Sequence, residues 1–370
     1  MNWKQAVKTI IFIAIFLYLL MTVTYVIRTN GDVKDRFTGF YAEPRNSIDV
    51  VMIGSSPVYP YYATPMMWGE YGIKAYPISS NLQRPVAAPY LVDEVRKTQN
   101  PSLYIFEMRM YTARDGDLTN NMAYTRGVTD NLKYSWNRVK TVNAMVDDIS
   151  ERYTYYFDIF KYHSNWKTIV LPSQLACFRY ERLDDQKGYV MTDEVGPCKE
   201  VDTSYITEEM KMPEKQEECL YQLLDYLKEN ELQALFILSP TVMEEEKQKM
   251  YNYMSGIIEE YGYEFLDMNE HNGEIGLDFA TDFSDYGGHT NALGAVKCTK
   301  FLTDYIVENY SLADKRTERG KNGERDKNSE RSYKKWDEAY EQWKQDLETA
   351  KVTIEKRISE GNFAEAPTEE

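Results

Sequence analysis

Two short stretches, far apart in the sequence, carry side chains that could act together as a nucleophile and its base. Ser55 and Ser56 follow Gly54 at the end of an apolar run, and His289 comes four residues after Asp285. A serine hydroxyl is a poor nucleophile until a neighbouring imidazole takes its proton. A carboxylate on the other ring nitrogen stabilises the imidazolium that forms. Together the stretches predict acyl-transfer or hydrolytic chemistry.

Each stretch holds a second residue that competes for the same role. Ser55 and Ser56 share one turn, and sequence alone does not separate them. Asp282 is the alternative to Asp285 as the carboxylate that orients His289. Either stretch alone is more often an ordinary turn or loop cap, but their joint occurrence favours a catalytic site.

The elements that must position these residues are those of an α/β protein. The apolar run at 48–53 is typical of a buried parallel strand, and ligands bind outside the carboxyl ends of such strands. Further strands are predicted at 73–78, 102–106, 232–238 and 264–267, and helices at 87–97, near 220–227, at 244–261 and at 291–307. This order predicts a three-layer α/β/α sandwich with a parallel sheet.

The two stretches resemble the first and last sequence blocks of the SGNH (GDSL-like) hydrolase superfamily. Gly54-Ser55-Ser56 stands where the family has Gly-Asp-Ser, and Asp285 with His289 stands where it has Asp-x-x-His, with one residue inserted. The run from His289 through Asn291 to Gly294 is similar to a His-x-Asn-x-x-Gly signature. That signature is found in a membrane-anchored branch that includes proteins of teichoic acid D-alanylation and alginate O-acetylation. The likeness covers about 48–305.

The resemblance implies an acyl-Ser56 intermediate formed with His289 and Asp285. It further implies O-acyl (acetyl) transfer to a cell-envelope polysaccharide or related polymer, with a membrane-bound O-acyltransferase as partner. An SGNH esterase or deacetylase is one alternative. A catalytically inactive accessory or scaffold protein of a polymer-modification complex is another. No cofactor and no metal is expected, because the four cysteines show no metal-binding spacing.

This chain matches the family's oxyanion-hole donors poorly. It uses a glycine after the second strand, where this chain offers Ser80 and Asn81 as candidates. It uses an asparagine after the third strand, where this chain has Glu107 and Arg109. An ionised carboxylate cannot donate. Arg109 could donate a hydrogen bond or hold an anionic group of the substrate, and a salt bridge at the sheet end is the alternative.

A membrane anchor is predicted at 9–27. These nineteen residues carry no charge and, as a helix, would span roughly 28 Å, close to the thickness of a bilayer core. Lys4 and Lys8 precede the run, which predicts an uncleaved signal anchor with a cytoplasmic amino terminus and an extracytoplasmic main domain. Three basic residues between 28 and 36 oppose this orientation.

Charge and composition limit the kinds of partner that the protein can bind. A net charge of −16 argues against nucleic acid, and the 31 tyrosines could contact a carbohydrate substrate. Cys177 and Cys198 could bridge a loop outside the cytoplasm, although four separate buried cysteines are the alternative.

Three regions follow from these patterns. Residues 1–30 form a cytoplasmic stub and the anchor, and 31–310 form the SGNH-like domain, beginning with a polar stalk up to 47 and including an insertion at about 111–205. Residues 311–370 form a charged linker, a helix with a heptad stripe and an acidic tail. The stripe predicts docking on a partner, on a second copy or back on the domain.

Overall fold

The centre of the molecule is a five-stranded, all-parallel sheet with the order β2-β1-β3-β4-β5. The computed structural model describes residues 2–28, 31–167, 182, 184–317 and 327–366. The strands are β1 (Val50–Gly54), β2 (Ala75–Ser79), β3 (Leu103–Glu107), β4 (Ala234–Leu238) and β5 (Glu264–Asp267). The predicted α/β class with a parallel sheet is confirmed, and each predicted strand overlaps an observed one.

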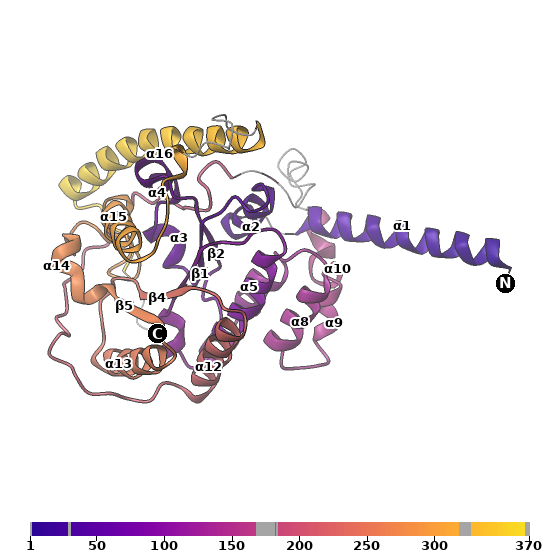
Figure 1. Ribbon diagram of the computed structural model, residues 1–370, viewed down its shortest axis with the longest axis horizontal. Helices are drawn as coiled ribbons and strands as arrows, with labels where there is room; N and C mark the ends of the chain where they lie inside the picture. Colours follow the sequence, from indigo (N-terminus) through magenta and orange to yellow (C-terminus); the bar gives the residue numbers. More distant parts are fainter. Residues whose placement is uncertain (1, 29–30, 168–181, 183, 318–326, 367–370) are drawn as a thin grey trace.

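Both faces of the sheet are covered by helices (Figure 1). In β1, Val51 and Ile53 pack into one hydrophobic cluster while Val50 and Met52 pack into the other, which explains the unbroken apolar run. The first cluster includes residues of α5 (Ala88–Arg96), α12 (Glu214–Glu229) and α13 (Glu245–Glu260); the second includes residues of α3 (Val58–Tyr61) and α15 (Ala292–Asn309).

The register aligns the carboxyl ends of the central strands. Gly54 pairs with Ser79, and Ile53 pairs with Phe106. A Cβ on Gly54 would lie 2.6 Å from the Cβ of Glu107, so a glycine is required for the ends of β1 and β3 to approach this closely. The segments after β1, β2 and β3 therefore meet along one edge of the sheet.

Helix α1 projects from the body, and α2 follows it (Figure 1). Helix α1 (Trp3–Ile27) is long and apolar enough to cross a membrane. The polar stalk predicted before 47 is wrong, because α2 (Asp32–Ala42) buries Phe37 and Phe40 in the core. Arg36 is buried as well, and its Nη1 donates to the carbonyl of Ser79 at 2.8 Å. The helix was not predicted because its sequence is polar. Its cations are nevertheless compatible with burial, because they form hydrogen bonds inside the protein.

The chain leaves the sheet between β3 and α12. Among the described residues of this region the helices are η2 (Arg109–Thr112), α6 (Asp115–Thr119), α7 (Met122–Thr129), α8 (Trp136–Met145), α9 (Arg152–Tyr156), α10 (Ile159–Tyr162) and η3 (His163–Lys167). Cys177 lies outside the described residues, and Cys198 forms no disulfide within them.

The carboxyl-terminal helix α16 (Lys327–Glu360) packs back on the domain. It lies along α4 (Thr64–Tyr71) and contacts α15 (Figure 1). Trp336 is fully buried, and the predicted stripe continues through the buried Trp343, Leu347, Ala350 and Ile354. Of the three predicted docking modes, the structure shows docking back on the domain. The remaining short helices are η1 (Pro85–Ala87), η4 (Met268–His271), α14 (Asn272–Ile275) and η5 (Lys315–Thr317).

Candidate active site

Ser56, His289 and Asp285 form a chain of hydrogen bonds at the carboxyl edge of the sheet. The Ser56 Oγ lies 2.8 Å from His289 Nε2. His289 Nδ1 lies 2.5 Å from Asp285 Oδ2, and the backbone N–H of His289 donates to Asp285 Oδ1 at 2.5 Å. Ser56 follows β1 and His289 precedes α15, so residues 233 positions apart meet. The arrangement can pass the hydroxyl proton to the imidazole and hold the imidazolium against a carboxylate.

Left-handed backbone shapes the loop between Asp285 and His289. Tyr286 has a φ of 65° and Gly287 a φ of 102°, a region that L side chains rarely adopt. At Gly288 a Cβ would lie 2.9 Å from Asp285 Oδ2. The two glycines therefore let the loop fold over the carboxylate while that carboxylate faces the histidine.

Burial and hydrogen bonding act in opposite directions on Asp285. Burial alone would raise the pKa of this carboxyl. The hydrogen bonds from the side chain and backbone of His289, with the positive charge of Arg109, bring the pKa below its ordinary value. Asp285 is thus the ionised partner that a positioned imidazole requires.

Asp282, the alternative orienting residue, has other partners. Its Oδ2 lies 2.6 Å from Lys297 Nζ and accepts from the backbone N–H of Asp278 at 2.8 Å. Its side chain is 1% exposed. It ties the start of the loop to α15, and the geometry gives the contact with His289 to Asp285 instead.

Ser55, the alternative nucleophile, points into the protein. The residue is 1% exposed, and its Oγ has no hydrogen-bond partner among the described residues. It is Ser56, partly exposed, that contacts His289.

The late signature has a structural explanation of its own. Asn291 is the N-cap of α15, and its Oδ1 accepts from the backbone N–H groups of Leu293 and Gly294. A Cβ on Gly294 would lie 2.5 Å from the carbonyl oxygen of Asp282. Both residues fix the start of α15 against the loop and thereby fix the direction from which His289 approaches Ser56.

Among the oxyanion candidates after β2, Asn81 is the accessible one. It is exposed, and its Oδ1 accepts from the hydroxyl of Tyr59 at 2.6 Å. Its amide nitrogen has no partner within the described parts of the chain and can donate to a substrate. Ser80 is fully buried, and its Oγ lies 3.3 Å from Gln83 Oε1. The backbone N–H of Ser56 is the second candidate, because the following Pro57 has none.

Arg109, the candidate oxyanion donor or anion-binding residue after β3, contacts the loop at 285–289 that carries His289, here called the histidine loop. Its Nη1 donates to the carbonyl of Gly288, the residue before His289. Its Nη2 donates to the carbonyl of Pro240 at 3.3 Å and lies 3.4 Å from the hydroxyl of Tyr61. The guanidinium therefore joins the end of β4 to the catalytic loop and positions His289.

Glu107 is a buried carboxyl at the end of β3. Burial raises its pKa to about 7, against the opposing effects of the Arg109 charge and of backbone N–H donors. Its Oε1 lies 4.0 Å from Arg109 Nε, so the ion pair is long. The salt bridge expected as the alternative role of this pair is present, but it is secondary to the contacts of Arg109 with the loop.

Two segments that contact the loop carrying His289 were not predicted from sequence: the segment around 196 and the carboxyl-terminal tail. The N–H of Gly196 donates to the carbonyl of Phe283 at 2.9 Å, and the N–H of Tyr286 donates to the carbonyl of Gly196 at 3.0 Å. Tyr286 also donates through its hydroxyl to the carbonyl of Ala364 at 2.7 Å. The segment around 196 and the carboxyl-terminal tail thus brace the histidine loop. No motif marks these backbone contacts.

The other two histidines are engaged elsewhere. His271 Nδ1 lies 3.1 Å from Glu274 Oε2, and its ring packs on Phe301. His163 Nδ1 lies 3.1 Å from the carbonyl of Phe160. Across the described ranges, no group of three or more His, Cys, Asp or Glu side chains is placed to hold a metal ion.

Comparison with known proteins gives no relative. No family model matches the chain, no curated protein matches it, and no solved structure matches it. Assignment of the site therefore rests on its residues and their distances.

Proposed function

We propose that this protein is a membrane-anchored, extracytoplasmic acyl-ester enzyme that works through an acyl-Ser56 intermediate. The observation that carries the proposal is the continuous chain from Ser56 Oγ through both ring nitrogens of His289 to Asp285. Nucleophile, base and orienting carboxylate lie within hydrogen-bond reach of one another, as this chemistry requires.

In the proposed reaction, Ser56 Oγ attacks the acyl carbonyl while His289 Nε2 takes the hydroxyl proton. The tetrahedral oxyanion receives hydrogen bonds from the Ser56 N–H and the Asn81 amide. The imidazolium then protonates the leaving oxygen, and the acyl group stays on Ser56. In the second half, His289 removes a proton from the acceptor hydroxyl, which attacks the acyl ester. The bond from the acyl carbon to Ser56 Oγ then breaks, and His289 returns the proton to that oxygen.

The fold supports an SGNH-like assignment, which remains part of the proposal. The parallel sheet with helices on both faces supports an α/β/α sandwich. Ser56 after β1 and His289 before the closing helix α15 have the order expected from the sequence resemblance. Asn81 would serve in place of the family's second-block glycine.

The proposed location and acceptor follow from the anchor and the resemblance. Helix α1 is long and apolar enough to span a membrane. Envelope polysaccharide or a related polymer is the proposed acceptor, and a membrane-bound O-acyltransferase is the proposed source of the acyl group. A reporter fused after Glu370 that is active only outside the membrane should be active. A carboxyl domain protected from added protease in intact cells would refute this orientation.

Full-length protein supplied with an acetyl ester donor, with and without a glycan acceptor, tests transfer. We expect acetylated glycan by mass spectrometry and little free acetate when the acceptor is absent. If the polymer modification in cells requires the protein but survives Ser56→Ala, the inactive scaffold role is correct instead.

Hydrolysis is the second candidate, and one observation favours it. The side chains of His289 and Asp285 are 31% and 42% exposed. Water can therefore reach the base beside the acyl-serine. Rapid release of acetate without acceptor, with no acetylated glycan when acceptor is present, would establish an esterase or deacetylase.

A further inference from the structure

We propose that the segment Arg152–Lys167, comprising α9, α10 and η3, rests on the lipid surface beside the membrane anchor and fixes how the catalytic domain sits on the bilayer. This inference depends on the proposed anchoring through α1. It adds a second contact with the membrane, made by the folded domain itself.

Exposed aromatic side chains mark this segment. Tyr153, Phe157, Phe160 and Trp166 expose between 50% and 65% of their surfaces. The rings of Tyr153 and Phe160 contact each other edge to face, with centroids 5.3 Å apart, so they form a patch rather than isolated residues. Tyr and Trp concentrate at the boundary between lipid and water, where an apolar ring and a polar edge are both accommodated, and exposed Phe beside them supplies apolar surface that can enter it.

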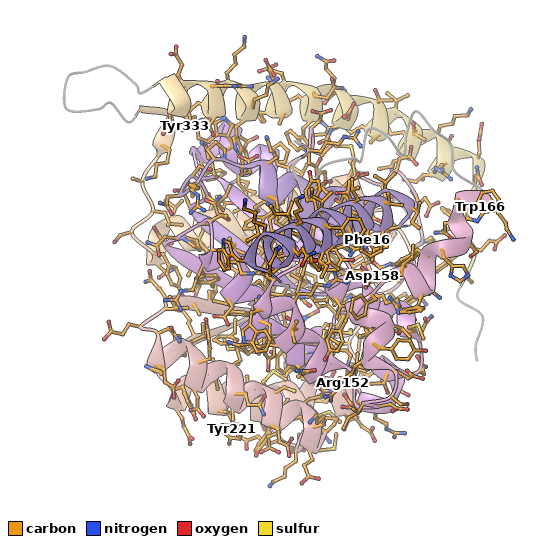
Figure 2. The ribbon with its side chains drawn as sticks, turned by 90° about the vertical axis from the view of Figure 1, so that its right-hand side faces the viewer. Phe16, Arg152, Asp158, Trp166, Tyr221 and Tyr333 are labelled. Atoms are coloured by element: carbon orange, nitrogen blue, oxygen red, sulfur yellow. The ribbon has the colours of Figure 1, made fainter. Side chains whose placement is uncertain are left out.

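The patch adjoins the point where the anchor enters the body. Asn165, next to Trp166, donates from Nδ2 to the carbonyl of Ile27, the last residue of α1, at 3.0 Å. Helices α9 and α10 lie on the side of the body from which α1 projects (Figure 1), and Figure 2 looks onto that side, with Phe16 on α1 and Trp166 labelled. Any membrane that surrounds α1 therefore meets this face of the domain first.

The part of the anchor available to lipid is short, which brings this face of the domain close to the membrane. The charge-free run covers 9–27, but Thr24, Tyr25 and Ile27 are buried in the body. The part left for lipid is 9–23, or about 22 Å of helix at 1.5 Å per residue. A hydrocarbon core is about 30 Å thick. This short run draws the surface around the last turn of α1 toward the outer boundary of the membrane.

Charge on the segment suits a phospholipid surface. Within 152–167 the basic residues are Arg152, Lys161 and Lys167, and the one carboxylate, Asp158, is buried and paired with Arg28 and Arg138. Three cations against one anion give this stretch a local charge of +2 in a chain of net charge −16. Exposed Lys161 also lines a cavity of about 420 Å³ beside the start of α2, where a lipid phosphate can approach it.

Seating this face on lipid would also orient the active site, to which α2 is linked by contacts. Arg36, in the second turn of α2, lies with its guanidinium carbon 3.9 Å from the centroid of the Tyr59 ring. Tyr59 in turn bonds to Asn81, the proposed oxyanion donor. A domain held on the bilayer by two contacts would present Ser56 at a constant height to an acyl donor that leaves the membrane, whereas one held by a single helix could tilt.

Lipid photocrosslinking of the full-length protein tests the inference. Wild-type protein is placed in nanodiscs whose phosphatidylcholine carries a diazirine on the acyl chain close to the glycerol, and adducts are mapped by mass spectrometry. We expect adducts on α1 and also on peptides within 152–167. In F157S/F160S/W166S, adducts within 152–167 should fall severalfold while those on α1 remain.

The matched control changes three exposed apolar side chains elsewhere on the body, in V201S/Y205S/V352S, and should leave both sets of adducts unchanged. Adducts on wild-type α1 without any in 152–167 would overturn the inference and leave the patch for a protein partner. Absence of adducts on α1 itself would instead overturn the proposed anchoring. The wild-type measurement decides between these outcomes even if the triple variant does not fold.

Discussion

Glu107→Gln should change how the stability of the domain depends on pH. The pKa of Glu107 is raised from 4.5 to about 7 by burial. Because the folded state holds the proton more tightly than the unfolded state, this group stabilises the fold fully below pH 4.5, and that contribution is lost as pH rises through 7. A shift of this size corresponds to about 3 kcal/mol at 1.36 kcal/mol per pKa unit. The amide resembles the protonated acid and cannot ionise.

The assay is urea unfolding of full-length protein in detergent micelles at pH 5 and pH 8. Wild type should lose about 2.5 kcal/mol of unfolding free energy between these values through Glu107, and Glu107→Gln should lack most of that loss and be the more stable protein at pH 8. Glu94→Gln is the control, since Glu94 accepts from Tyr41 and Asn137 and its replacement should destabilise the protein. A variant no more stable than wild type at pH 8, with the wild-type pH slope, would refute the reasoning.

Two further predictions concern the loop and the last helix. Gly288→Ala puts a methyl group 2.9 Å from Asp285 Oδ2, so it should lower ester turnover, whereas Gly273→Ala, with nothing within 4 Å of its new Cβ, should not; equal turnover in both would show that the loop is free to move. Trp336→Ala should cost about 3–5 kcal/mol of unfolding free energy because the side chain is fully buried, while Val352→Ala on the exposed face of α16 should change it by less than about 0.5 kcal/mol. Equal melting temperatures for these two variants would mean that α16 does not contribute to the core.

The positions of the strands were accessible from sequence because a parallel strand covered on both faces is apolar at every position. In β1, for example, Val50 through Ile53 are all buried. Ser56 and His289 were also accessible, since each lies close to an element boundary that the pattern predicts. The sequence left Asp282 and Asp285 as alternatives, and only the contact with His289 separates them. The helix α2 was missed because Arg36 reads as a surface residue, although it bonds to the Ser79 carbonyl inside the protein.

The role of Arg109 was inaccessible for a related reason. Its partners are backbone carbonyls at Pro240 and Gly288, more than a hundred residues away, and carbonyls leave no mark in a sequence. The sequence left undecided which surface α16 docks on, because a heptad stripe indicates an apolar face but not the surface that covers it. The packing of α16 in the structure, such as Trp336 against Trp68 on α4, decides that question.

A serine-directed phosphonate probe tests the central claim most directly. On the purified full-length protein, mass spectrometry should place the adduct on Ser56, because His289 Nε2 lies 2.8 Å from that hydroxyl while the Ser55 hydroxyl is buried. Ser56→Ala and His289→Ala should each abolish labelling and ester turnover, with the double variant no worse than either, and Asp285→Asn should lose less. An adduct on Ser55, or Ser56→Ala retaining turnover, would contradict the account.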